Sequence, residues 1–223
     1  MTVVSHPLEI LVVDDHAIVR EGLVRILEGG GRPWHATEAS SGFQAIEWLR
    51  RHEVDVAIVD LSMPGMGGLE LIRRIRAEFG AVGVLVLSMH AEEQYALRAF
   101  KAGANGYLTK DRAGAELVEA VGKVASGGAY VTASLAEQVV LRLNGALEAP
   151  AHSQLSDREF DVLRRIVAGQ RLTDIADALH LSVKTVSTHK RRIQDKLQLP
   201  TTAALIRYGM EQGLRTEDSL SGT

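Results

Sequence analysis

Carboxylate, hydroxyl and ammonium side chains follow a series of short apolar stretches in the first half of the chain. The stretch LEILVV ends on two adjacent acids, Asp14 and Asp15. Like charges repel, and a carboxylate at the end of a buried strand loses solvation, so this pair needs a cation nearby. Later apolar stretches end on or are followed by Asp60, Ser88 and Lys110. Hard carboxylate oxygens suit Mg²⁺, which takes few protein ligands and keeps several waters.

These polar residues would lie at the same end of a sheet if the apolar stretches are its parallel strands. Five apolar runs alternate with stretches whose apolar residues recur at three- and four-residue steps. The runs cover residues 8–14, 34–40, 54–60, 82–88 and 105–110. They predict an α/β domain, a doubly wound, flavodoxin-like parallel sheet with helices on both faces. With the strand order 2-1-3-4-5, the three acids, the hydroxyl and the ammonium converge at the carboxyl ends of the strands.

A structural explanation exists for each of these residues taken singly. Carboxylates often lie at strand ends because loops are exposed to water. That explanation fits one acid better than three acids, a serine and a lysine at the same end of a sheet. His16 is a possible extra metal ligand, but an ordinary residue in the first helical turn is the simpler interpretation. Tyr107 alone reads as packing on an edge strand.

Residues 8–126 resemble the receiver domain of two-component response regulators. The motifs VVDDH, IVDLSMPGMGG, VLVLS and GYLTK carry the resemblance, in the family's order and at about its spacings. The resemblance implies that a sensor histidine kinase phosphorylates Asp60. Lys110 and Ser88 are then expected to contact the phosphoryl group, and Tyr107 is expected to be the switch residue.

The same resemblance implies the ligands of a Mg²⁺ ion. Asp15, Asp60 and the backbone carbonyl of Ser62 are expected to bind it directly, and Asp14 through a water molecule. Such a protein is a phosphoacceptor rather than an enzyme, with only Mg²⁺-assisted self-phosphorylation and slow self-dephosphorylation. Many receivers have proline after the lysine, in a cis bond, but here Asp111 follows Lys110. Because a cis bond before a residue other than proline costs about 3–4 kcal/mol, we expect a trans bond.

The second half of the chain is more basic than the first and lacks strand patterns. Residues 1–149 carry 14 basic and 19 acidic side chains, and residues 150–223 carry 11 and 9. Ser156 and Glu159 predict a capping box at the start of a helix. The stretch 183–197 reads as a helix with an apolar stripe of Val183, Val186, Ile193 and Leu197. Its opposite face is rich in Lys, Arg, Ser and Thr, which suits phosphates and base edges. A protein-docking or solvated helix would show a similar face.

Residues 153–214 are similar to the LuxR-type helix-turn-helix of the NarL/FixJ response regulators. The similarity is carried by LSDREFDVLRRIVAGQ and DIADALHLSVKTVSTHKRRIQDKL. It implies that a homodimer binds double-stranded operator DNA and contacts RNA polymerase. Residues expected to face base edges are Ser187, Thr188 and Arg191. Residues expected to contact phosphates are Lys184, Thr185, Arg192 and Lys196. His189 is expected to be packed and hydrogen-bonded rather than to read bases.

We therefore expect a smaller, all-α DNA-binding domain at residues 153–223 after a receiver domain at residues 1–128. Residues 129–152 form the expected linker, with a helix near 132–143. The chain has no Cys, so a disulfide or a thiolate metal site is excluded. MTVVSHP lacks a secretory pattern, and no apolar run approaches the ~20 residues that span a bilayer. We expect a cytoplasmic protein without membrane contact.

Two other functions remain open from the sequence. The receiver could be an unphosphorylated dimerisation module attached to the same DNA-binding domain. The acids could also belong to a Mg²⁺-dependent phosphatase, although the sequence offers no second acid–base pair for turnover.

Overall fold

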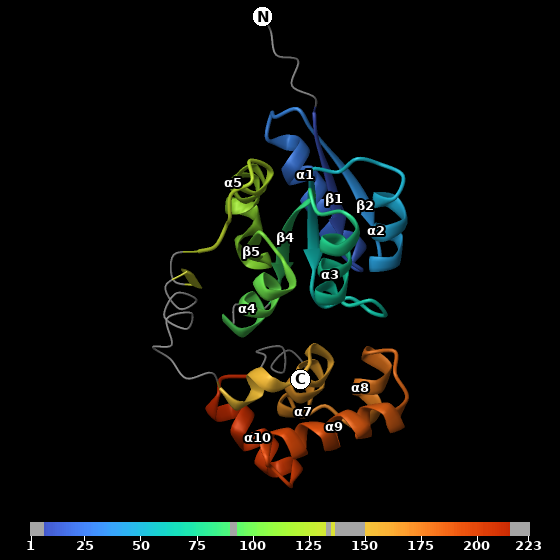
Figure 1. Cartoon of the computed structure of the whole chain (residues 1–223), viewed down its shortest axis with the longest axis vertical. Coiled ribbons are helices and arrows are strands. Elements are labelled where there is room, and N and C mark those ends of the chain that lie inside the picture. The colour runs from blue at the N-terminus through green and yellow to red at the C-terminus, as the bar shows by residue number, and fades with distance from the viewer. Residues whose placement is uncertain (1–6, 90–92, 133–134, 137–149, 215–223) are drawn as a thin grey trace, which may run out of the picture. The chain divides into compact units, whose positions relative to one another are not determined.

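Five apolar segments form one parallel sheet in the first of two units, Met1–Leu147 and Glu148–Thr223, into which the chain divides. The strands are β1 (Leu8–Val13), β2 (Trp34–Ala39), β3 (Val56–Asp60), β4 (Gly83–Ser88) and β5 (Gly106–Thr109). Their order is β2-β1-β3-β4-β5, which confirms the predicted doubly wound topology (Figure 1). The computed structural model describes residues 7–89, 93–132, 135–136 and 150–214. Most of the helix expected near 132–143 lies outside these residues.

Helices cover both faces of the sheet (Figure 1). They are α1 (Ala17–Gly29), α2 (Gly42–Leu49), α3 (Gly68–Glu78), α4 (Glu93–Ala102) and α5 (Ala113–Ala125). Ile10 of β1 and Ile58 of β3 belong to a core with Leu27 of α1 and Leu117 of α5. The alternate strand side chains, such as Leu11 and Val59, are also fully buried. Burial on both faces explains why the strands are almost continuously apolar.

The register of the strands aligns the polar residues that follow them. Val13 of β1 pairs with Val59 of β3, so Asp14 and Asp60 leave the sheet at the same level. Asp60 pairs with Leu87, and Ser88 pairs with Thr109, the residue before Lys110. The sheet therefore brings together at one edge side chains that are far apart in the sequence.

The second unit is helical. A 3-10 turn (Ala151–Gln154) precedes α7 (Asp157–Val167), α8 (Leu172–Ala178), α9 (Val183–Leu197) and α10 (Thr202–Glu211). The predicted capping box is confirmed: the Ser156 hydroxyl accepts from the Glu159 N–H, and the Glu159 carboxylate accepts from the Ser156 N–H. Helix α7 packs against α9 and α10, and α8 packs against α9. Among the described residues, no helix has both the length and the apolar character needed to cross a membrane.

The predicted apolar stripe of α9 is wrong at one position. Val186, Ile193 and Leu197 are buried as expected, whereas Val183 is 44% exposed. Val183 is the first residue of α9. A helical wheel describes the direction of a side chain and not whether a neighbouring helix extends that far.

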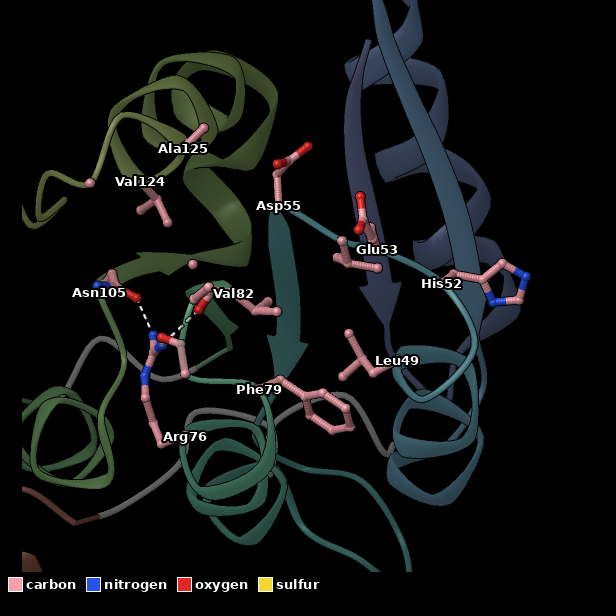
Figure 2. Close-up of a pocket in the computed structure, with 15 residues that line it drawn as sticks. Leu49, His52, Glu53, Asp55, Arg76, Phe79, Val82, Asn105, Val124 and Ala125 are labelled. Atoms are coloured by element: carbon pink, nitrogen blue, oxygen red, sulfur yellow. Dashed lines mark hydrogen bonds between the residues drawn. The ribbon is translucent and has the colours of Figure 1, made fainter. Parts of the chain in front are cut away.

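Arg76 of α3 ties together the amino ends of β4 and β5 (Figure 2). Its guanidinium donates to the backbone carbonyls of Gly80, Val82 and Gly103 and to the side-chain oxygen of Asn105. Burial lowers the pKa of this guanidinium. Gly103 has a φ of +109°, and a Cβ there would collide with the Arg76 side chain. The close approach therefore requires glycine on one side and a five-donor side chain on the other.

Arg76→Met should lower the free energy of unfolding by about 1–3 kcal/mol, because several partly buried acceptors lose their donor. Urea unfolding followed by circular dichroism would measure it. The matched control is Arg74→Met on the same helix, where an exposed pair with Glu70 at 3.8 Å is lost. That change should cost less than about 0.5 kcal/mol. Equal losses of unfolding free energy in the two variants would show that the hydrogen bonds of Arg76 contribute no more than an exposed ion pair.

Candidate functional site

Four side chains near the carboxyl ends of β1 and β3 form an acidic cluster. Asp14, Asp15, His16 and Asp60 each offer one potential metal-ligand atom, and these atoms all lie within 4.8 Å of one another. Asp14 and Asp60 are almost completely buried, with exposed fractions of 1% and 2%. The predicted convergence of the three carboxylates is therefore present in the fold.

Lys110 provides the positive charge beside this cluster. Its Nζ lies 2.6 Å from Asp14 Oδ2 and 3.3 Å from Asp60 Oδ1. The lysine side chain is itself largely buried. The ammonium thus bridges acids from two different strands, although it follows a third strand, β5.

The charges in this pocket are only partly balanced. Burial raises the pKa of Asp60 to about 6; the Lys110 ammonium opposes this shift, the Asp14 charge adds to it, and a backbone hydrogen bond from Ser62 reduces it. Burial alone would lower the pKa of Lys110, but the charges of Asp60 and Asp14 outweigh burial and raise it. One lysine therefore does not compensate for all the carboxylates around it.

Two buried carboxylate oxygens have no hydrogen-bond partner within the described part of the chain. They are Oδ2 of Asp60 and Oδ1 of Asp15; the latter makes no hydrogen bond to a described residue, although the His16 Nδ1 lies 3.1 Å from it. A buried acceptor without a partner is costly, and it is expected where an ion or water completes the site. These two oxygens are hard donors of the kind that Mg²⁺ prefers, so the residues present fit that ion.

The remaining residues predicted for this site lie on β4, on β5 and on the loop after β3. Ser88 is fully buried at the end of β4, and Tyr107 of β5 is 1% exposed. Ser62 is exposed on the loop after β3. The bond between Lys110 and Asp111 is trans, as expected, since no described peptide bond is cis.

Two residues to which the sequence analysis assigned no role also touch the acidic loops. Arg20 of α1 donates from Nη1 to the backbone carbonyl of Asp14 at 2.7 Å. Gly68 packs so tightly against Asp60 that a Cβ would collide with the Asp60 carbonyl. The paired glycines of MPGMGG were a signal for the second contact. The first depends on how α1 lies against β1, which local sequence does not reveal.

Helix α9 presents most of the predicted DNA-binding residues to solvent. Lys184, Thr188, Arg191 and Arg192 are exposed, whereas Thr185 and Ser187 are partly buried. The Ser182 hydroxyl caps the helix by accepting from the Thr185 N–H at 3.1 Å. The amino end of the helix is therefore fixed while its basic face stays accessible.

Two side chains of α9 differ from the simple expectation of a solvated basic face. The Lys196 ammonium lies 2.7 Å from Glu159 Oε2 of α7, so it is already paired with a carboxylate. His189 is partly buried, as expected, but its Nδ1 has no hydrogen-bond partner among the described residues. Burial lowers the pKa of His189 and favours the neutral ring.

A cavity of about 580 Å³ lies at the opposite end of the sheet, between the amino ends of β3 and β4 (Figure 2). It is lined by Arg76, His52 and Asn105, among others. Its charged lining residues are Glu53, Asp55 and Arg76, and the Arg76 guanidinium is bound to backbone carbonyls.

Comparison with known proteins matches both units to described families. Residues 10–122 match the response regulator receiver domain, and residues 153–209 match the bacterial regulatory proteins of the luxR family. The response regulator UvrY of Escherichia coli K12 is 36% identical, over 96% of this chain and 99% of its own length. The probable transcriptional regulatory protein NarL of Mycobacterium tuberculosis is 37% identical, over 92% and 94%.

Solved structures agree with these matches. RcsB of Salmonella enterica serovar Typhimurium, bound to the promoter P1flhDC with the phosphomimetic BeF3-, aligns with a TM-score of 0.63 at 27% identity. The alignment covers 91% of this chain and 98% of that one. The predicted strand order, helical second domain and sequence motifs are thus found together in one group of proteins. The chain belongs to the response regulators, with a receiver domain followed by a LuxR-type helix-turn-helix DNA-binding domain.

Proposed function

We propose that a sensor histidine kinase transfers a phosphoryl group to Asp60 and that this modification controls sequence-specific DNA binding by α9. The observation that carries the proposal is the Asp60 carboxylate, which is only 2% exposed and has, within the described part of the chain, one oxygen without a hydrogen-bond partner beside a lysine. In the transfer, an Asp60 oxygen forms a bond to phosphorus as the phosphorus–nitrogen bond of the donor histidine breaks. Acyl phosphates on aspartate are an established form of covalent intermediate.

Mg²⁺ would neutralise charge on the phosphoryl oxygens as they pass through a loose transition state. Asp15, Asp60 and the backbone carbonyl of Ser62 would hold the ion directly, and Asp14 would hold it through water. The ligand set is supported by the Asp15 and Asp60 oxygens that make no hydrogen bond to any described residue.

The other residues of the pocket stabilise the transferred group. Lys110 already lies 3.3 Å from Asp60 Oδ1, so its ammonium can pair with a phosphoryl oxygen with little movement. The Ser88 hydroxyl would bond a second oxygen, and the turn of Ser88 would let Tyr107 move. Small phosphodonors would phosphorylate the protein without a kinase, and slow self-dephosphorylation would reset it.

The helical unit would recognise a two-half-site operator as a homodimer. Ser187, Thr188 and Arg191 would face base edges. Phosphate contacts would come from Lys184, Thr185, Arg192 and Lys196, the last only after leaving Glu159. Two-fold symmetry places the half-sites about 10 bp apart. A solved structure of RcsB, a protein 26% identical to this chain, is described as two dimers bound to two parallel DNAs.

The proposed domain boundaries are based on the two family matches. Residues 1–128 would form the receiver, residues 129–152 the linker, and residues 153–223 the DNA-binding domain. Acting on promoters, the protein would work in the cytoplasm and contact RNA polymerase.

Asp60→Asn should abolish covalent labelling by acetyl phosphate in the presence of Mg²⁺, because the amide is a far weaker nucleophile than the carboxylate. Mass spectrometry of the intact protein would measure the added phosphoryl group. Asp55→Asn, at the other end of the same strand, is the matched control and should be labelled like the wild type. Persistent labelling of Asp60→Asn would disprove the assignment.

Without divalent cations, the raised pKa of Asp60 should appear in the pH dependence of stability. An unfolded aspartate has a pKa of 3.8 and the folded Asp60 a pKa of about 6, so the folded state binds the extra proton between these values. Stability contributed by the protonated carboxyl is therefore lost as the pH rises from about 4 to about 6. Asp60→Asn should escape this loss and gain roughly 2–3 kcal/mol over the wild type across that interval. Urea titrations in EDTA would measure both profiles; parallel profiles would contradict the shift.

Substitutions in α9 should separate base reading from phosphate binding. Arg191→Ala should relax base preference at one operator position. Lys184→Ala should weaken binding to every DNA sequence and reduce the salt slope by ~1. Fluorescence anisotropy on operator and scrambled duplexes, at several salt concentrations, would measure both effects. Equal loss by both variants on every duplex would show that the division of roles is wrong.

A further inference from the structure

Arg20 links the loop that carries Asp14 and Asp15 to the neighbouring strand β2. Its Nη1 donates to the Asp14 carbonyl at 2.7 Å, and its Nε donates to Glu38 Oε2 at 3.1 Å. The Arg20 side chain is 13% exposed. Glu38 lies in β2, in register with Val12 of β1. One guanidinium therefore joins helix α1, the loop after β1 and the end of β2.

The carbonyl that Arg20 holds belongs to the peptide bond between Asp14 and Asp15. The N–H of Asp14 is held as well, because it donates to the Ala39 carbonyl at 3.2 Å. Both the Ala39 carbonyl and the Glu38 carboxylate belong to the end of β2. The main chain at Asp14 is thus fixed on two sides, and the direction in which Asp15 leaves it is fixed as a consequence.

Asp15 depends on this restraint more than its neighbour does. The Asp14 carboxylate is buried and bound to Lys110, whereas the Asp15 side chain is 24% exposed and its Oδ1 has no hydrogen-bond partner among the described residues. Adjacent carboxylates repel each other, and the group beside the Asp15 oxygen is the exposed His16 ring, whose Nδ1 lies 3.1 Å away and carries charge only when protonated. A fixed peptide plane restricts the directions in which the Asp15 carboxylate can point.

The Arg20–Glu38 pair affects the acidic loop through the position of the backbone and not through added positive charge. Arg20 is paired with Glu38, so the two side chains together add no net charge near the acids. The compensating cation of the pocket is Lys110. Groups that orient metal ligands typically change metal affinity by ~10–100-fold when they are removed.

We propose that Arg20, held by Glu38, is a positioning residue that sets the Asp14–Asp15 peptide so that the Asp15 carboxylate binds Mg²⁺ together with Asp60. This inference rests on the proposed function of the pocket.

The test is Mg²⁺ binding by full-length Arg20→Met, measured by isothermal titration calorimetry without a phosphodonor. The dissociation constant should rise about 10-fold or more. Arg25→Met is the matched control, because Arg25 lies on the same helix and is exposed; its affinity should equal that of the wild type. Glu38→Gln keeps an acceptor for Nε and should have a smaller effect than Arg20→Met.

A second measurement distinguishes a misdirected Asp15 carboxylate from a misfolded pocket. With acetyl phosphate, the Mg²⁺ concentration for half-maximal labelling should rise in Arg20→Met by the same factor as the dissociation constant. The labelling rate at saturating Mg²⁺ should match the wild type, which a misfolded pocket would not achieve. If Arg20→Met does not fold by circular dichroism, Arg20→Lys and Glu38→Gln replace it, because lysine lacks the second nitrogen needed for both contacts and glutamine removes the charge that holds Arg20.

Wild-type affinity in Arg20→Met, or equal weakening in Arg25→Met, would overturn the inference. A wild-type protein that binds no Mg²⁺ would instead overturn the proposed function of the pocket. The two failures are therefore distinguishable.

Discussion

Two carboxylates of like charge, those of Asp14 and Asp60, are buried beside a single ammonium group, that of Lys110. Burial removes the solvation of all three groups, and the attraction of the lysine offsets only part of that loss. The pKa of Asp60, raised to about 6, records what remains uncompensated. The residues of this pocket fit a further cation, and the packed sheet keeps the Asp14 and Asp60 carboxylates away from solvent. The rest of the receiver unit serves to hold this unfavourable arrangement in place.

The sheet holds the buried acids in place by the packing of apolar side chains rather than by polar contacts. Ile10 and Ile58 on one face, and Leu11 and Val59 on the other, are buried to 1% exposure or less. Since these residues lie in the strands that end at Asp14 and Asp60, any shift of register would move an acid and also expose apolar surface. The burial of apolar side chains that stabilises the domain therefore also fixes the positions of Asp14 and Asp60.

Much of this could be predicted from the sequence because it depends on local pattern. Continuous apolar runs followed by Asp14, Asp60 and Ser88 predicted parallel strands ending at one edge, and the observed order agrees. The contacts that local pattern did not reveal all join separate elements. Lys196 meets Glu159 because α9 packs on α7, and Arg20 meets Glu38 because α1 lies beside β2. The prediction that Val183 belongs to the buried stripe of α9 is wrong for the same reason, because its exposure depends on where a neighbouring helix ends.

The strand that carries Tyr107 and precedes Lys110 lies at the edge of the sheet, and its outer side is not left open. The Tyr107 N–H donates to the Tyr130 carbonyl at 2.9 Å, and the Tyr130 N–H donates to the Asn105 carbonyl at 3.0 Å. The Tyr130 hydroxyl also donates to Glu116 of α5 at 2.8 Å. An edge strand exposes unpaired backbone groups unless something covers it. Here the edge is covered by Tyr130, which follows α5. A rearrangement of β5 therefore has to move Tyr130 as well or break these hydrogen bonds. Strand β5, which precedes Lys110, is thereby joined to Tyr130 and, through the Tyr130 hydroxyl, to α5.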